Sequence, residues 1–319
     1  MPNLRALKNR IPWWGKILGQ VFVSSLPVTY KFWHRIGLLE HGRMQDPSYA
    51  YGVFTKHFSR VRFSRRYTGW VGLELGPGDS LFSAIIARCF RATACYLIDA
   101  GEFADKDFQK YKKMTVFLQQ QGLLAPKLDH VASVGDVLKT CNSTYETGGL
   151  TSLRAIPTGS VDFIWSHVVL QSVRRAEFFE CLLELRRILR DDGACSHTMD
   201  LRDQLGNALN HLRFPESIWE SNAIAKCGSY SNRYRYSEML TMFQKAGFNV
   251  DVVEVNRWNQ LPTPRSKLDV LFRGMPDKEL LVSGFAVILT PALAQGKRPP
   301  ISTKIVTSNG SLILEAHQV

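Results

Sequence analysis

The sequence predicts an α/β protein in which a doubly wound, mostly parallel sheet carries helices on both faces. Between residues 67 and 290, short apolar stretches typical of buried strands alternate with segments of helical periodicity. The first expected strand, 71–75, ends in a glycine-rich turn, and the second, 94–98, ends at an acidic residue. Turns of this kind lie at the carboxyl ends of parallel strands, where open α/β sheets bind ligands.

The expected elements follow one another in a regular order along the chain. We expect strands at 71–75, 94–98, 161–166, 194–199, 248–255 and 280–289. We expect helices at 81–90, 106–121, 175–190 and 236–246, and a turn at 191–193. The chain therefore divides into an N-terminal extension (1–66), a main domain (67–290) with an insertion on the substrate side (201–235), and a C-terminal tail (291–319).

Composition and charge limit the class of protein. Of 319 residues, 45% are hydrophobic, which is enough to bury a core and excludes global disorder. The net charge is +12, but residues 1–66 hold twelve Lys or Arg and only two Asp or Glu. The sequence thus describes a nearly neutral domain with a basic N-terminal extension. No uninterrupted apolar run reaches the roughly 18 residues of a membrane-spanning helix.

The basic extension contains an amphipathic helix, expected at 9–24, with Trp14, Ile17, Leu18 and Val21 on one face. An aromatic and basic stretch follows at 30–39. The pattern favours a helical cap on the core. A second interpretation is that residues 1–45 make peripheral contact with an anionic membrane surface. Nucleic acid is the least favoured partner.

The cysteines and the N-terminus indicate a cytoplasmic protein, with a peripheral position at the inner face of the membrane as the alternative. None of the six cysteines forms a C-x-x-C pair, which is typical of reduced, buried thiols. The N-terminus imitates a signal peptide, but Lys16 and Gln20 interrupt its apolar segment and no cleavage motif follows.

The glycine-rich turn is the strongest ligand-binding signal. Gly76 and Gly78 allow a ligand to approach the backbone closely. A dinucleotide fingerprint requires a third glycine where Leu81 stands, and a P-loop requires a lysine that is absent at that spacing. The turn therefore favours a nucleoside ligand with little phosphate, and Leu81 argues against a dehydrogenase.

The E-x-G-x-G pattern at 74–78, followed by Asp99 at the end of the next strand, resembles the class I S-adenosylmethionine-dependent methyltransferases. The resemblance covers about residues 67–290 and includes the fourth-strand motif at 160–170. It implies a Rossmann-like fold and S-adenosyl-L-methionine as cofactor. Asp99 would bind the ribose hydroxyls and Glu74 would lie near the amino-acid end. The implied cofactor-binding residues are Glu74, Gly76, Gly78, Ser80, Asp99 and Ser166. The adenine would pass somewhere along 145–156.

The segments 197–203, 210–214 and 232–236 resemble bacterial methyltransferases associated with surface-polysaccharide synthesis. This chain departs from their pattern, because Gln204 replaces a histidine, and Gln171 and Ser172 replace a Glu-His pair. These departures leave open whether activity is retained, altered or lost.

The resemblance nevertheless suggests residues for the chemistry. His197 would act as a general base, oriented by Asp200 or Asp203, and His167 is the second candidate. The implied substrate-binding residues are Asp203, Asn232, Arg233 and Arg235. The alternative for His197 is a structural histidine, and for the arginines a solvated or salt-bridged face. A divalent metal at His197 and the aspartates stays open but is not indicated.

The function expected from these patterns is methyl transfer to a hydroxyl of a saccharide or other small molecule. Two alternatives remain: a catalytically degenerate S-adenosylmethionine-binding module, and a nucleic-acid methyltransferase. The second is less favoured because residues 166–169 read Ser-His-Val-Val in place of the N/D-P-P-Y/F run of base methylation.

Overall fold

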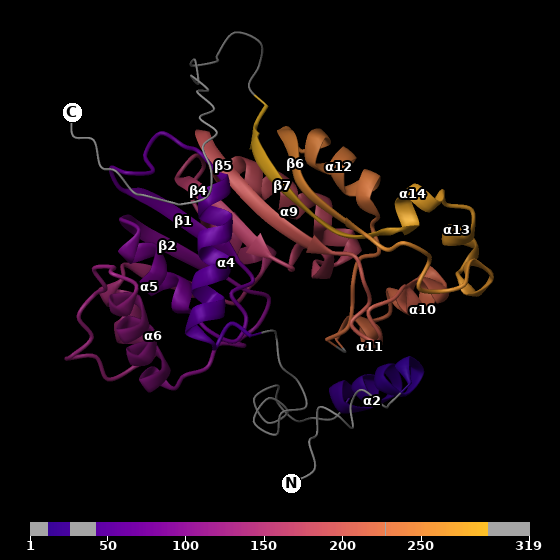
Figure 1. Cartoon of the computed structure of the whole chain (residues 1–319), viewed down its shortest axis with the longest axis horizontal. Coiled ribbons are helices and arrows are strands. Elements are labelled where there is room, and N and C mark those ends of the chain that lie inside the picture. The colour runs from indigo at the N-terminus through magenta and orange to yellow at the C-terminus, as the bar shows by residue number, and fades with distance from the viewer. Residues whose placement is uncertain (1–11, 26–42, 227, 293–319) are drawn as a thin grey trace.

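The computed structural model describes residues 12–25, 43–226 and 228–292. Its centre is a seven-stranded sheet of order β3-β2-β1-β4-β5-β7-β6 (Figure 1). Strands β3, β2, β1, β4 and β5 are parallel, whereas β7 runs antiparallel between β5 and β6. The strands are β1 (Trp70–Leu75), β2 (Ala92–Ile98), β3 (Ser143–Glu146), β4 (Val161–His167), β5 (Leu189–Asp200), β6 (Phe248–Arg257) and β7 (Val282–Pro291). This order confirms the predicted Rossmann-like, doubly wound fold and sets its switch point between β1 and β4.

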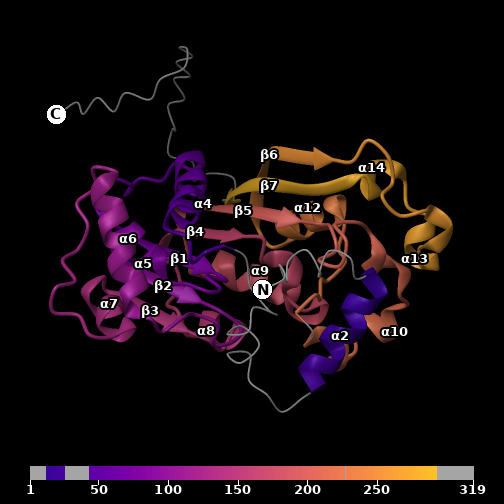
Figure 2. The same ribbon diagram turned by 60° about the horizontal axis from the view of Figure 1, so that its bottom comes forward.

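Helices cover both faces of the sheet (Figures 1 and 2). Because side chains alternate along a strand, Phe163 and Trp165 of β4 face one apolar core, whereas Ile164 faces the other. The helices of the first face are α4 (Pro47–Arg60), α5 (Phe82–Cys89), α6 (Phe108–Gln120) and α7 (Val134–Thr140). Those of the second are α8 (Leu150–Ala155), α9 (Arg175–Ile188) and α12 (Tyr236–Lys245).

Helix α4 makes residues 44–63 part of the main domain. Asp46 caps the helix by accepting hydrogen bonds from the Ser48 and Tyr49 N–H groups, and Pro47 occupies its first turn. The apolar side of α4 is buried in the same core as β1 and α5. The predicted boundary at residue 67 therefore cuts through a continuous core. Residues 1–11 and 26–42 of the predicted extension, including the whole 30–39 stretch, lie outside the described residues.

The predicted turn at 191–193 is part of β5. In the pairing of β4 with β5, Val161 lies opposite Leu189 and Phe163 opposite Ala194, so the intervening residues of β5 bulge out of register. Because of the bulge, β5 continues through Asp191, Asp192 and Gly193, where the sequence predicted a turn.

The insertion after β5 contains two short helices, α10 (Glu216–Trp219) and α11 (Asn222–Ala225). Helix α2 (Trp13–Ser25) lies against it, beside α10 in Figure 2. Two more short helices, α13 (Val270–Arg273) and α14 (Asp277–Leu280), precede β7. The predicted tail lies outside the described residues from 293 onward.

None of the described helices is both long enough and apolar enough to span a bilayer. The five cysteines in the described part of the chain are free thiols, and Cys227 lies outside it.

Candidate functional site

The turn after β1 lies at the carboxyl ends of the parallel strands, at the switch point between β1 and β4. Gly76 and Gly78 have φ angles of 74° and 69°, in the left-handed region that favours glycine. The Gly76 N–H donates to the Ile98 carbonyl at 2.8 Å, which ties the turn to β2. A Cβ on Gly76 would lie 2.4 Å from Val169 Cγ2. Position 76 thus requires a glycine for two reasons: its backbone conformation and the close approach of the loop after β4.

Asp99 presents its carboxylate where β2 meets this turn. Its Oδ2 accepts from the Gly78 N–H at 3.0 Å, and its Oδ1 accepts from the Ala100 N–H at 2.8 Å. Each oxygen keeps a further lone pair, so the carboxylate is able to accept from two adjacent hydroxyls. Burial raises the pKa of Asp99 to about 6, so the group is still mostly ionised at neutral pH.

A cavity of about 380 Å³ opens beside Asp99. Its lining residues are Ala100, Gly148, Gly149, Leu150, Thr151, Arg154, Glu177 and Glu180. The Gly149 N–H donates to the Asp99 carbonyl at 2.9 Å, which holds this segment against the end of β2. The lining thus includes part of the 145–156 segment expected to pass the adenine, and we refer to it as the first cavity.

The other three residues proposed for the cofactor are buried. Glu74 lies beneath the turn and accepts from Trp165 Nε1 at 3.0 Å; burial raises its pKa to about 7. The Ser80 hydroxyl donates to the Met44 carbonyl and so ties the turn to the segment that leads into α4. Ser166 is fully buried in the core on the α9 side of the sheet. Both hydroxyls thus have partners within the fold, and their assignment to the cofactor stays a prediction.

His197, the first candidate for a general base, also faces that core. It is fully buried, and its Nδ1 is 2.7 Å from the Ser166 Oγ. Burial lowers the pKa of His197 to about 3, and its Nε2 has no hydrogen-bond partner among the described residues. His197 thus lies inside the core and lines neither cavity, which favours the alternative of a structural histidine.

Two of the proposed substrate-binding residues instead stabilise loops. Asp203 accepts hydrogen bonds from three backbone N–H groups that follow it, those of Leu205, Gly206 and Asn210. Asn232 is fully buried and donates to the carbonyls of Leu170 and Val173 at 3.0 and 3.2 Å. Both side chains thus supply hydrogen bonds to backbone groups of the loops around them.

The two arginines are buried as well. Arg233 donates to the Phe214 carbonyl at 2.7 Å. Arg235 donates to four carbonyls, those of Leu201, Glu279, Leu280 and Val282. Burial lowers the pKa of Arg235 to about 10, which leaves it charged at neutral pH. These contacts hold both arginines inside the fold, and their assignment to the substrate stays a prediction.

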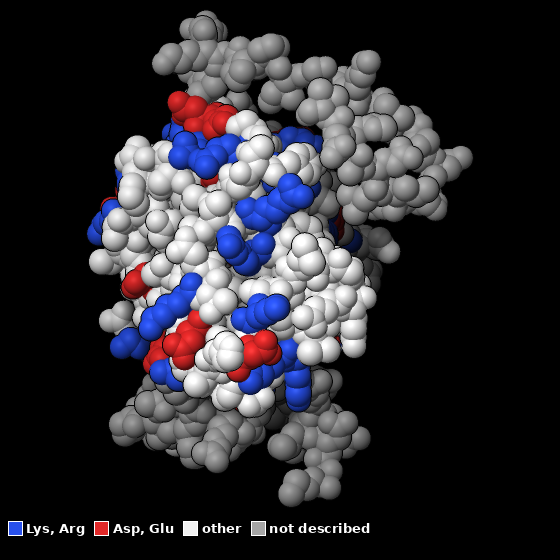
Figure 3. Space-filling view, turned by 90° about the vertical axis from the view of Figure 1, so that its left-hand side faces the viewer, with Lys and Arg blue, Asp and Glu red and all other residues white. Residues whose placement is uncertain are grey.

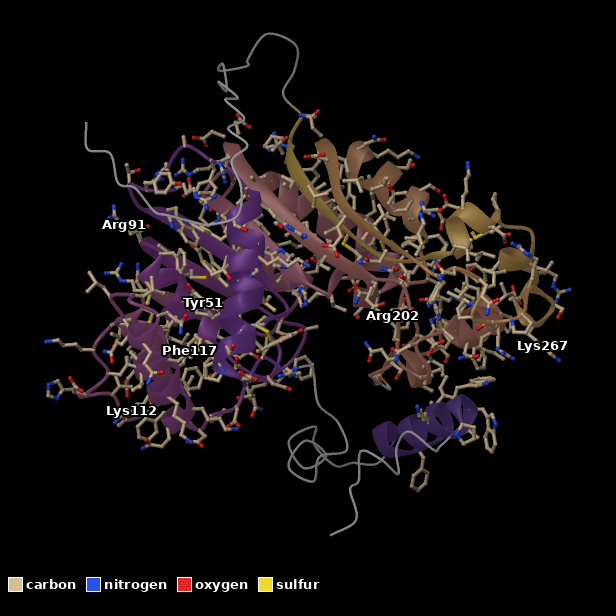
Figure 4. All side chains as sticks on the ribbon, in the orientation of Figure 1. Tyr51, Arg91, Lys112, Phe117, Arg202 and Lys267 are labelled. Carbon is tan, nitrogen blue, oxygen red and sulfur yellow. The ribbon has the colours of Figure 1, made fainter. Side chains whose placement is uncertain are left out.

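A second, smaller cavity of about 50 Å³ lies at the carboxyl ends of β4 and β5. The three residues that depart from the polysaccharide-associated pattern, Gln171, Ser172 and Gln204, all line it. The other lining residues are Val168, Asp200, Arg202, Asp203, Asn207, Ser229, Tyr230 and Ser231. Figure 4 labels Arg202 where the sheet meets the insertion. Asp200, the third catalytic candidate, binds Arg202 in a bidentate pair, with Nη2 to Oδ2 at 2.7 Å.

His167, the remaining candidate, lies at the end of β4 on the α4 side and belongs to a chain of polar contacts. Its Nε2 is 3.4 Å from the Tyr49 hydroxyl, and its Nδ1 is 3.4 Å from Nε2 of His57. His57 Nδ1 is in turn 2.8 Å from the Ser196 Oγ. Burial lowers the pKa of both histidines, so both rings are neutral at pH 7.

The sequence interpretation missed Tyr49 and His57, because it assigned both to a separate extension. The signal was present: the Asp46-Pro47 cap is followed by buried residues at helical spacing, from Ala50 to Phe58. Among the described residues, no three His, Cys, Asp or Glu side chains are grouped as a metal site would require.

No protein-family model matches this chain, and no curated protein sequence matches it. Solved structures do match. The YcgJ protein of Bacillus subtilis is 14% identical over 76% of this chain and 97% of its own, with a TM-score of 0.40. CrArsM, an arsenic(III) S-adenosylmethionine methyltransferase of Chlamydomonas reinhardtii, is 13% identical over 75% of this chain and 67% of its own, with a TM-score of 0.43.

A structure of the Haloferax volcanii Trm112 methyltransferase activator with a methyltransferase also matches. It is 13% identical over 79% of this chain and 96% of its own, with a TM-score of 0.40. At such identities and scores, these proteins say nothing about what this chain binds.

Proposed function

We propose that this protein is an S-adenosylmethionine-dependent methyltransferase that acts on a hydroxyl of a saccharide or other small molecule. One observation carries the proposal. Two left-handed glycines at the end of β1 meet the Asp99 carboxylate at the end of β2, beside the first cavity. This arrangement suits a nucleoside, because Asp99 has free lone pairs for two ribose hydroxyls. Neither a third glycine nor a P-loop lysine is present to hold a pyrophosphate.

The residues at the turn fit the cofactor. Asp99 would bind the ribose, Gly76 and Gly78 would allow the backbone to approach, and Ala100 and Leu150 offer apolar contact to an adenine. When bound, S-adenosylmethionine supplies an electrophilic methyl group. The protein must then hold the acceptor in line and take up the proton that its hydroxyl releases.

The Tyr49–His167–His57–Ser196 chain provides that proton acceptor. In one orientation of its hydrogens, Tyr49 donates to His167 Nε2, His167 Nδ1–H donates to His57, and His57 Nδ1–H donates to Ser196. The acceptor hydroxyl would give its proton to the Tyr49 oxygen while Tyr49 gives its own proton to His167 Nε2. The net result is the transfer of one proton from the acceptor to His167. A neutral His167 is ready for this role, because burial and the nearby Lys56 and Arg60 lower its pKa.

The second cavity is the proposed acceptor site. Amide and hydroxyl side chains such as Gln171, Ser172, Asn207 and Tyr230 line it, and these groups both donate and accept hydrogen bonds. Saccharide hydroxyls require such partners. His167 is the last residue of β4, and Val168, which follows it directly, lines the cavity.

A second function is favoured by the same cavity. Gln171, Ser172 and Gln204 replace ionisable residues there, and Asp200 is already paired with Arg202. A protein with this lining would bind the cofactor as a degenerate module without transferring its methyl group.

Two measurements test these functions. Calorimetry should show that S-adenosylhomocysteine binds and that NAD does not. Binding of NAD alone would contradict both proposed functions. Transfer of labelled methyl groups into a total cell extract then separates them. An enzyme labels a saccharide-containing fraction, whereas a degenerate module binds S-adenosylhomocysteine and labels nothing.

A further inference from the structure

Helix α2 is attached to the protein by one face and exposes large apolar residues on the other. Ile17 is 5% exposed, whereas Trp14, Leu18 and Phe22 are 55%, 63% and 67% exposed. These three residues are spaced by four, so they form one row along the helix. Figure 4 shows side chains of α2 that point away from the rest of the molecule. We call this row the α2 apolar row.

The attached face is well anchored. Ile17 packs with Leu205, Trp219, Ile224 and Tyr230 in a small core of its own. Lys16 Nζ donates to the Leu205 carbonyl at 2.7 Å. The Arg213 guanidinium lies 4.9 Å from the Trp13 ring. The orientation of α2 is therefore fixed by packing, which leaves the α2 apolar row facing outward.

Charge indicates which partner suits this row. Helix α2 contains no acidic residue, and the chain on either side of it, 1–11 and 26–42, holds five Lys or Arg and one Glu. On the face shown in Figure 3, the left-hand side of Figure 1, Lys and Arg are by contrast dispersed among neutral and acidic residues. Exposed Trp, Leu and Phe in a basic segment are typical of helices that lie in the plane of an anionic membrane surface.

We propose that α2 is an interfacial anchor that binds an anionic bilayer through Trp14, Leu18 and Phe22. The anchor lies close to the second cavity. Tyr230 lines that cavity and packs on Ile17, and Leu205 follows the lining residue Gln204. Docking through α2 brings the cavity to the membrane, so the acceptor is an amphiphile, a saccharide carried on a lipid. This choice of acceptor rests on the proposed methyltransferase function, whereas the docking does not.

The experiment is co-sedimentation of the full chain with vesicles of phosphatidylcholine alone or mixed with phosphatidylglycerol. The test variant is the triple change Trp14→Gln, Leu18→Gln and Phe22→Gln. The matched control changes three other exposed apolar residues, Leu124, Val270 and Leu271, to Gln; their exposed fractions are 94%, 76% and 56%. Because all six side chains are exposed, thermal unfolding should be similar in both variants.

Wild type and control should bind the anionic vesicles equally, and the α2 triple variant should bind about 10²-fold more weakly or worse. Salt at about 0.5 M, where the Debye length is roughly 4 Å, should weaken but not abolish wild-type binding. The proposal is overturned if wild type stays in the supernatant or if the α2 variant binds like wild type. A second outcome also overturns it: wild type forms a dimer in analytical ultracentrifugation, the α2 triple variant does not, and wild type does not bind vesicles. In that case a second copy of the chain covers the α2 apolar row.

Calorimetry of the same variants with S-adenosylhomocysteine separates this proposal from the methyltransferase function. Unchanged affinity in a variant that no longer binds vesicles supports an anchor distinct from the cofactor site. Absence of S-adenosylhomocysteine binding in wild type overturns the proposed function and leaves the vesicle result to stand alone.

Discussion

The residues proposed for the cofactor and those proposed for the substrate differ in how their polar groups are used. On the cofactor side, Gly76, Gly78 and Asp99 lie at the strand ends and keep capacity for a ligand. Among the residues proposed for the substrate, Asn232, Arg233 and Arg235 are buried and bind backbone groups of this chain, whereas Asp203 binds backbone groups and also lines the second cavity. The difference arises because the cofactor turn is short and joins a strand directly to a helix. The 201–235 insertion, by contrast, is irregular, so its backbone needs side chains as hydrogen-bond partners.

The two histidines show the same contrast between the faces of the sheet. His167 and His197 lie on the neighbouring strands β4 and β5. The residue opposite His197 is Ser166, so His167 is one position further along β4. Strand alternation therefore sends His167 toward α4 and His197 into the α9 core. The two rings therefore have different partners: His167 contacts Tyr49 and His57 of α4, whereas His197 contacts Ser166 within the core.

The largest expected effect separates these two histidines. His167→Ala should lower methyl transfer by about 10²–10⁴, the usual contribution of a general base, while S-adenosylhomocysteine affinity is kept. His197→Ala should leave turnover per folded molecule near wild type and lower the free energy of unfolding, because it empties a buried site and removes the Ser166 contact. Rates and chemical denaturation of both variants are the measurement. The reverse pattern would return catalysis to His197.

Next in size is the loss of Arg235. Arg235→Ala leaves four carbonyls without their donor and should lower the free energy of unfolding by about 3–5 kcal/mol. Arg202→Ala is the control, since its ion pair with Asp200 is solvent-exposed and should contribute no more than about 1 kcal/mol. Urea denaturation measures both. A stable Arg235→Ala protein with weakened acceptor binding would restore the substrate-binding interpretation.

On the cofactor side, Asp99→Ala should weaken S-adenosylhomocysteine binding by about tenfold or more, because hydrogen bonds to a carboxylate contribute roughly 1.5–3 kcal/mol. Asp136→Ala, a change at an exposed helix start, should leave the affinity unchanged. Calorimetry decides. Equal affinities in both variants would move the cofactor site away from the end of β2.

The smallest expected effect is a pH dependence of the same binding. Burial raises the pKa of Asp99 to about 6, so below that pH the folded protein carries a protonated carboxyl with reduced capacity to accept from the ribose. Affinity for S-adenosylhomocysteine should therefore be constant above about pH 7 and fall as pH drops through 6, by up to about tenfold near pH 5. Titrations of wild type and Asp99→Asn across this range test it, since the amide should bind weakly at every pH. An equal pH dependence in both proteins would exclude Asp99 as its source.

Sequence patterns predicted six of the seven strands and the position of the glycine-rich turn, but not the short strand β3 or the helices α4, α7 and α8. Both follow from local rules: apolar periodicity defines the elements, and a glycine-rich turn after a strand defines the ligand edge. The antiparallel β7, inserted between β5 and β6, has no local signal of this kind, because strand order depends on contacts between distant segments.

Only the tertiary structure decided which polar residues are free to act. The sequence predicts that Asp99, His197 and Arg235 all belong to the functional site. It does not show which of these side chains are buried or which groups they contact. In the folded protein His197 is buried and Arg235 donates to four backbone carbonyls. Tyr49 and His57 of α4 contact His167, which is more than a hundred residues away in the sequence. Burial and partners are properties of the assembled sheet and helices, and they determine whether a polar group stabilises the fold or remains available for a ligand.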